Sequence, residues 1–266
     1  MTLSPVYSPM DILGWHKDTP VTADIVFNRI DAWGNLLKDT PGERCALYLH
    51  DTIEFICAMV ASLREGKTVY LSPNTLPVTC AALARTVDVY LGEFPAEYSP
   101  QRVSAVSTQR EQHECGALTI PAASEIVVFT SGSTGEAQAI RKQVWQLRAE
   151  VETLTALFGS IGTKSADIVS TVSHQHIYGL LFKVFFPLHN GNPIYAANVN
   201  FPEELIVATS ERDAILLSSP AHLARFVESD VWQKADHRVR AIFSSGGTLT
   251  HEVSRKVAAS MKTAPV

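Results

Sequence analysis

The chain has 266 residues, of which 46% are hydrophobic and 18% are charged, and its formal net charge is -5 at pH 7. This composition is typical of a globular protein that buries a core, and it excludes disorder as the default state. A negative balance without a long Lys/Arg run argues against nucleic acid or an anionic membrane as the main partner.

The four cysteines are widely spaced and form no C-x-x-C pair, so we expect buried free thiols rather than a metal finger or a disulfide framework. The first 15 residues lack the basic start and apolar stretch of a signal peptide. The most apolar segment, 180–188, carries Lys183 and falls short of the ~20 residues that span a bilayer. A cytoplasmic location without a membrane span is therefore expected.

Short β-branched runs alternate with helical patterns along the chain. In the first half we expect strands at 45–50, 68–72 and 87–92, helices at 53–64 and 78–86, and an irregular connection at 93–123. In the second half we expect strands at 125–131, 167–173, 192–198, 214–219 and 240–245. Helices are expected from Val144, at 177–188, 202–209 and 221–228, and from His251. The alternation predicts an α/β fold with mostly parallel sheets flanked by helices, in two subdomains, 1–123 and 124–266.

The strand EIVVFTS runs into a loop of six small residues, which are Thr130, Ser131, Gly132, Ser133, Thr134 and Gly135. A long helix is expected next. Glycines allow close backbone approach, successive N–H groups form anion-binding concavities, and a helix N-terminus favours negative charge. This pattern indicates a polyphosphate site, although a structural strand-to-helix turn whose hydroxyls cap the helix is the alternative. The segment matches neither the P-loop, nor G-x-S-x-G, nor G-x-G-x-x-G.

The stretch FTSGSTG resembles the phosphate-binding signature of the adenylate-forming enzymes, which include acyl-CoA synthetases, aryl-CoA ligases and peptide-synthetase adenylation domains. The resemblance implies that residues 130–135 hold the β- and γ-phosphates of ATP. The family usually continues with a proline and a lysine, whereas Ala137 and Gln138 stand here. Arg141 or Lys142 could supply the missing charge, but a solvated helix start is the preferred interpretation of that pair.

Two later segments resemble the same family in the same order. In SHQHIYGLLFKVFFPLHNG, the residues His176, Tyr178 and Gly179 match a histidine and an aromatic-Gly pair that open a helix beside the acyl pocket. In RAIFSSGGTLT, Gly246 and Gly247 match a turn near the adenine and acyl pocket. Core histidines and an ordinary tight turn are the structural alternatives. On a strand, His174 and His176 would share a face, but no third metal ligand has a recognisable spacing.

The resemblance extends from about Pro41 to near the C-terminus and includes the strand-helix unit PGERCALYLHDTIEFICAMVASLREG. The segment HQHIYGLLFKVFFPL is further similar to acyl-CoA-synthetase-like proteins associated with aryl-polyene and pigment pathways. The family's aromatic-Gly-x-Thr-Glu motif, whose glutamate helps hold Mg²⁺, does not occur in the sequence. The ribose-binding aspartate and the C-terminal domain with its catalytic lysine are also missing. The sequence is therefore expected to be an N-terminal portion of such an enzyme.

The resemblance implies that a carboxylic acid attacks the α-phosphorus of ATP to form an acyl-adenylate, with Mg²⁺ as the metal cofactor. The acyl group then passes to the thiol of CoA or of an acyl carrier protein. No residue is assigned as a general base. A noncatalytic nucleotide- or acyl-binding module is the alternative, and an α/β domain with a purely structural loop is the third possibility.

Overall fold

The computed structural model describes residues 1–104, 115–131, 137–159, 166–234 and 237–261. These residues divide into two compact units. Unit 1 comprises residues 1–11, 22–150 and 175–177, and unit 2 comprises residues 12–21, 151–174 and 178–266. This division differs from the expected break after residue 123, because strand β8 beyond that point pairs with β5 before it.

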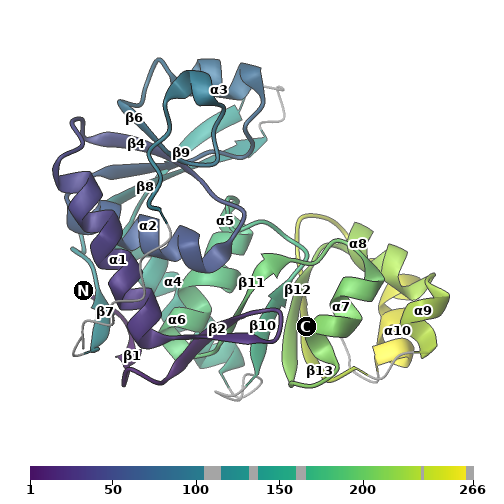
Figure 1. Cartoon of the computed structure of the whole chain (residues 1–266). Coiled ribbons are helices and arrows are strands. Elements are labelled where there is room, and N and C mark those ends of the chain that lie inside the picture. The colour runs from purple at the N-terminus through teal and green to yellow at the C-terminus, as the bar shows by residue number, and fades with distance from the viewer. Residues whose placement is uncertain (105–114, 132–136, 160–165, 235–236, 262–266) are drawn as a thin grey trace. The chain divides into compact units, whose positions relative to one another are not determined.

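Unit 1 is built on a five-stranded sheet in the order β6-β4-β5-β8-β9 (Figure 1). Its first four strands are parallel, and β9 joins β8 antiparallel. Their bounds are Arg44–Tyr48 (β4), Thr68–Leu71 (β5), Val89–Gly92 (β6), Glu125–Ser131 (β8) and Ala137–Gln143 (β9). A separate antiparallel pair joins β1 (Thr2–Val6) to β7 (Ala117–Thr119). The sheet places the residues that follow β4, β5, β6 and β8 at one edge.

Helices α1 (Ala23–Lys38) and α2 (Thr52–Arg64) pack against each other in unit 1. An ion pair reinforces this packing, because Arg29 Nε lies 2.7 Å from Glu54 Oε2 and Trp33 Nε1 donates to Glu54 Oε1 at 2.7 Å. Helix α2 is buried along almost its whole length, as its apolar sequence predicts. The remaining helices are α3 (Pro77–Leu83), the short η1 (Ala96–Tyr98) and α4 (Val144–Phe158), whose last turns belong to unit 2.

Unit 2 contains a six-stranded sheet in the order β13-β12-β10-β11-β2-β3. The strands β13, β12, β10, β11 and β2 run parallel to one another. Their bounds are Ile12–His16 (β2), Thr19–Thr22 (β3), Asp167–Ser170 (β10), Ile194–Asn198 (β11), Ala214–Ser218 (β12) and Val239–Ser244 (β13). Both sheets therefore confirm the expected α/β class with mostly parallel strands.

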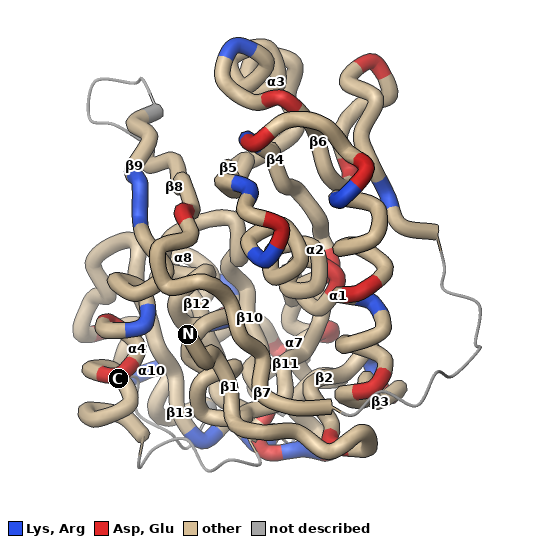
Figure 2. Tube along the Cα trace, turned by 90° about the vertical axis from the view of Figure 1, so that its left-hand side faces the viewer, with Lys and Arg blue, Asp and Glu red and all other residues tan. Residues whose placement is uncertain are grey.

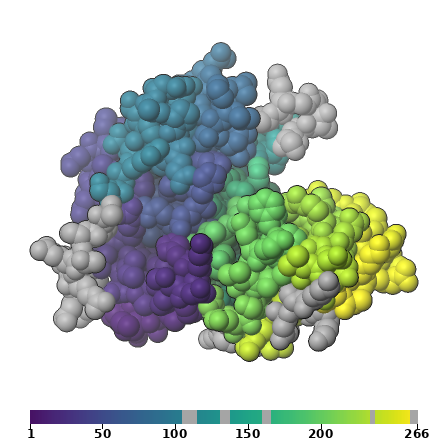
Figure 3. All heavy atoms as spheres, turned by 45° about the vertical axis from the view of Figure 1, so that its right-hand side comes forward, coloured from purple at the N-terminus to yellow at the C-terminus, as the bar shows by residue number. Residues whose placement is uncertain are grey.

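The helices of unit 2 pack on its sheet and complete two hydrophobic layers. In Figure 3 the described part of the chain from β12 onward is coloured green to yellow, and its atoms pack together. Leu216 and Ile242 face one layer, with Leu223 and Phe226 of helix α8, whereas Leu217 and Phe243 face the other. The bounds are Ile177–Gly179 (α5), Leu180–Phe185 (π-helix η2), Phe186–Asn190 (α6), Pro202–Thr209 (α7), Pro220–Val227 (α8), Asp230–Lys234 (α9) and His251–Met261 (α10).

Two expectations about local structure were wrong. The 93–123 connection is not wholly irregular, because it contains β7, which pairs with a strand more than 110 residues earlier. The element after the Ser/Thr/Gly loop is the strand β9 rather than a helix, and α4 begins only at Val144. Among the described helices, none is both long and apolar enough to cross a bilayer.

Candidate functional site

The Ser/Thr/Gly loop joins β8 and β9, which form a regular antiparallel hairpin from Glu125↔Gln143 to Ser131↔Ala137. Thr130 is half-buried and lies opposite Gln138. Gly132, Ser133, Thr134 and Gly135 lie outside the described residues. The loop therefore leaves the carboxyl end of β8, beside the carboxyl ends of parallel strands, where ligands gather in α/β sheets. Since a strand follows it, the expected contribution of a helix N-terminus to this loop is withdrawn.

The basic pair after the loop is held within the hairpin and not at a helix start, which corrects the preferred interpretation. Arg141 forms an ion pair with Glu125 and donates to the Tyr70 hydroxyl at 3.2 Å. Lys142 Nζ lies 2.8 Å from Glu150 Oε1. In Figure 2 a blue stretch marks basic residues on β9, and a red position marks an acidic residue close to β8. Both cations already have anionic partners, so neither replaces the missing loop lysine without breaking an ion pair.

The two histidines of SHQH do not lie on a strand, which corrects the expectation that they would share a face. They lie in the turn between β10 and α5, where His174 is buried and His176 is exposed. Although His176 is exposed, partial desolvation of its ring lowers its pKa, so its imidazole is mainly neutral at pH 7. In the described part of the chain, no three His, Cys, Asp or Glu side chains converge as a metal site.

Gly179 lies where its backbone comes very close to the backbone of residues 173 and 174. A Cβ atom added there would lie 2.0 Å from the carbonyl oxygen of Ser173 and 3.0 Å from the nitrogen of His174. The preceding Tyr178 packs its ring 5.1 Å from that of Phe182, and burial raises the pKa of its hydroxyl well above the usual value. Gly179 thus fixes the path of the turn that carries His174, and Tyr178 is a neutral, half-buried neighbour.

A row of hydroxyl side chains lies at the carboxyl edge of the unit 2 sheet. Thr171 Oγ1 and Ser218 Oγ are 3.0 Å apart and buried, and Ser218 is in register with Ser244 on the neighbouring strand. Ser219 follows directly and caps α8. These hydroxyl residues were not predicted as site residues, although serine and threonine after buried strands are a usable signal for a ligand-facing edge.

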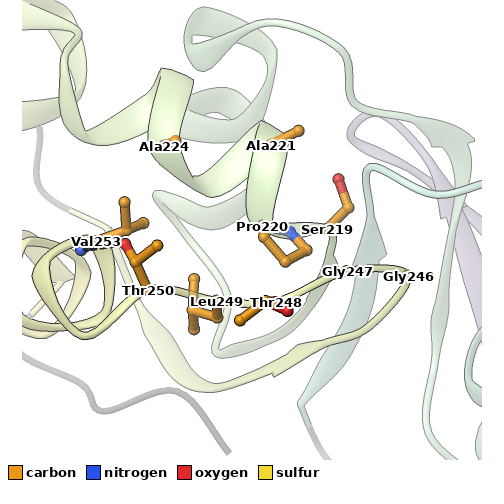
Figure 4. Close-up of a pocket in the computed structure, with 10 residues that line it drawn as sticks. All are labelled: Ser219, Pro220, Ala221, Ala224, Gly246, Gly247, Thr248, Leu249, Thr250 and Val253. Carbon is orange, nitrogen blue, oxygen red and sulfur yellow. Dashed lines mark hydrogen bonds between the residues drawn. The ribbon is translucent and has the colours of Figure 1, made fainter.

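A pocket of about 390 Å³ opens between the start of α8 and the turn after β13 (Figure 4). It is lined by residues 219–221, Ala224, residues 246–250 and Val253. Gly246 has a φ of 85°, a conformation that favours glycine, and it lets the chain turn along the pocket. The structure therefore brings the predicted Gly246 and Gly247 together with α8. The apolar lining residues were missed because they carry no chemical signature in sequence.

Ser219, which lines this pocket, is hydrogen-bonded to His222 on α8. The Ser219 hydroxyl lies 2.9 Å from His222 Nδ1 and accepts a longer hydrogen bond, 3.4 Å, from the His222 backbone N–H. Burial, followed by the charge of Arg225, lowers the pKa of His222. At pH 7 the Ser219–His222 pair is consequently polar but mainly uncharged.

By sequence, no protein-family model and no curated protein matches this chain. Solved structures match it by fold. A malonyl-CoA ligase in a ternary product complex with methylmalonyl-CoA and AMP matches with a TM-score of 0.73 at 18% identity, over 98% of this chain and 58% of its own. MatB from Rhodopseudomonas palustris with ATP bound matches with a TM-score of 0.69 at 15% identity, over 98% and 56%.

The o-succinylbenzoate CoA synthetase MenE from Bacillus subtilis, in complex with AMP, matches with a TM-score of 0.75 at 16% identity. That match covers 95% of this chain and 68% of MenE. The chain spans little more than half of the malonyl-CoA ligase and MatB structures. Over nearly all of its length, the chain has the fold of the corresponding part of the adenylate-forming acyl-CoA synthetase-like enzymes.

Proposed function

We propose that the chain supplies the ATP- and acid-binding portion of an adenylate-forming acid–thiol ligase. The observation that carries the proposal is the FTSGSTG loop, which leaves the carboxyl end of β8 in a fold shared with ATP- and AMP-bound ligases. Residues 130–135 would hold the β- and γ-phosphates through backbone N–H groups and hydroxyls. Such preorganised donors stabilise charge that develops on a pyrophosphate leaving group.

The acid would lie at the carboxyl edge of the unit 2 sheet, where its carboxylate attacks the α-phosphorus and releases pyrophosphate. Gly246 and Gly247 would contact the adenine and the acyl group, with Tyr178, Gly179 and His176 as further acid-site residues. The acyl-adenylate would then pass its acyl group to the thiol of CoA or of a carrier protein. The glutamate that helps hold Mg²⁺ in the resembled family belongs to a motif that does not occur in this sequence, so no residue of this chain is assigned to the ion.

The first test is ATP binding by isothermal titration calorimetry, together with ATP–pyrophosphate exchange over a panel of carboxylic acids. We expect the double variant Ser133→Ala/Thr134→Ala to lose both signals. A second Ser–Thr pair in the sequence supplies a matched control, Ser107→Ala/Thr108→Ala, which should behave like the wild type. Failure of the wild-type chain to bind ATP would refute the phosphate assignment.

A noncatalytic nucleotide- or acyl-binding module is the second candidate, and Gln138 favours it. This glutamine stands where the resembled family has a lysine, and the neighbouring cations Arg141 and Lys142 are paired with Glu125 and Glu150. ATP binding without pyrophosphate exchange for any acid would support the module. If a Gln138→Lys variant restored pyrophosphate exchange, the glutamine at that position would be the cause of the missing exchange activity.

A further inference from the structure

We infer that the acid taken by this chain is a monocarboxylic acid whose acyl group is uncharged and apolar. This inference rests on the proposed function, since it assigns the pocket beside Gly246 and Gly247 to the acyl group. Its basis is the chemistry of the pocket lining, its volume and the positions of the nearest cations.

Among the residues that the structure describes, none that lines the pocket is charged. Ala221 and Ala224 come from α8, and Leu249 and Val253 come from the turn and from α10 (Figure 4). Of the three lining hydroxyl residues, Ser219 caps α8, Thr250 accepts from the Val253 backbone N–H at 3.3 Å, and Thr248 is exposed. The surface offered to a ligand is therefore mainly hydrocarbon.

The pocket volume is about 390 Å³, and the pocket is open to solvent, because Ala221, residues 246–248 and Thr250 are exposed. This volume falls at the small end of the range for ligand pockets. A medium-chain or single-ring acyl group fits, whereas a long fatty acyl chain would extend out of the pocket.

A second carboxylate has no partner in this pocket. Moving an ionised carboxylate into an apolar site without a paired cation is strongly unfavourable, and sites that recognise carboxylates use Arg or Lys. Lys183 is fully buried, and its Nζ donates to Asn198 Oδ1 at 2.6 Å and to the Ala197 carbonyl at 3.2 Å. Arg225 follows Ala224 on α8 but is exposed and is not part of the lining. Dicarboxylic acids should therefore be rejected.

The matched probes are octanoate and octanedioate, which have the same carbon chain and differ in the second carboxylate. Calorimetry without ATP should show octanoate binding at least tenfold more tightly than octanedioate. Ala224→Leu should weaken octanoate binding at least tenfold by filling the pocket, and Ala224→Arg should reverse the preference between the two acids. Ala259→Leu, an exposed alanine-to-leucine change on α10 outside the lining, is the control and should leave binding unchanged.

Absence of octanoate binding, equal binding of octanedioate, or indifference to Ala224→Leu with intact circular dichroism would each overturn the inference. The result is separable from the proposed function, because the acid titration contains no ATP. Loss of ATP binding alone would remove the ligase assignment and leave the acid selectivity standing. Normal ATP binding with a preference for octanedioate would keep the ligase assignment and remove the proposed acid selectivity.

Discussion

Gly179 shows how a single hydrogen in place of a methyl group determines local structure. A Cβ there would lie 2.0 Å from the Ser173 carbonyl oxygen, and that backbone atom cannot rotate away. We expect Gly179→Ala to lower the free energy of unfolding by about 1–3 kcal/mol, as overpacking does. Urea denaturation followed by circular dichroism measures this change.

A second helical glycine provides the control for that experiment. At Gly34 in α1, the nearest neighbour of an added Cβ is Glu65 Oε1 at 3.7 Å, an ordinary contact. Gly34→Ala should raise the free energy of unfolding by about 0.5–1 kcal/mol, because alanine loses less backbone entropy on folding. If both variants were equally stable, the close approach at Gly179 would carry no energetic weight.

His222 should couple the stability of unit 2 to pH. Its folded-state pKa lies below the ordinary value of 6.5, first because of burial and then because of Arg225. As the pH falls, the unfolded chain takes up this proton first, so the stabilisation from a neutral His222 is complete above 6.5. It is then lost as the pH falls through 6.5 toward the folded pKa.

We therefore expect the wild type to lose more stability than His222→Gln when the pH is lowered from 7.5 to 5. Urea midpoints at the two pH values measure the difference, and an NMR titration of the imidazole reports its pKa directly. An imidazole midpoint at or above 6.5 would contradict the assignment of a desolvated, neutral ring beside Ser219.

At the scale of elements, the first turn of α2 depends on one side chain. Asp51 precedes the helix in an extended conformation and accepts a hydrogen bond from the Glu54 backbone N–H at 2.8 Å. Asp51→Ala should cost about 1 kcal/mol of stability, whereas Asp51→Asn should preserve most of it, because asparagine caps equally well. Equal losses in the two variants, measured by urea denaturation, would show that the charge matters more than the cap.

Elements with strong periodicity were predictable from sequence, and those that depend on distant partners were not. The predicted strand at 125–131 coincides with β8, and the helices predicted at 53–64 and 202–209 nearly coincide with α2 and α7. Strand β9 was missed because Ala, Gln, Arg and Lys have low strand propensity. Its conformation comes from pairing with β8 along seven residue pairs. Tertiary pairing thus overrode local preference.

The candidate site was predictable only where it carries unusual chemistry. The sequence singled out Gly246 and Gly247, which line the pocket and whose binding role stays a prediction, whereas Ala221, Ala224 and Leu249 resemble core residues in sequence. Small apolar side chains on a helix acquire a binding role only when a second element leaves space beside them. That space depends on how α8 and the turn after β13 pack, which no local pattern specifies.

Across the chain, the proposed phosphate loop and the pocket belong to different units. The hairpin of β8 and β9 belongs to unit 1, and the pocket beside α8 belongs to unit 2. The chain crosses between the units several times, so neither unit is one continuous segment. A nucleotide held by the loop should therefore act first on the stability of unit 1.

Ligand-linked unfolding tests that assignment. A ligand that binds only the folded state stabilises it by about 2.7 kcal/mol at 100 times its Kd, which corresponds to a rise in Tm of roughly 5–10 °C. We expect ATP to produce such a rise in wild type and in Ser107→Ala/Thr108→Ala, but not in Ser133→Ala/Thr134→Ala. Adenosine, which lacks phosphates, should have a smaller effect at equal concentration. Hydrogen exchange would locate the protection, which should be strongest in β8 and β9. Protection confined to unit 2 would mean that the phosphates bind elsewhere.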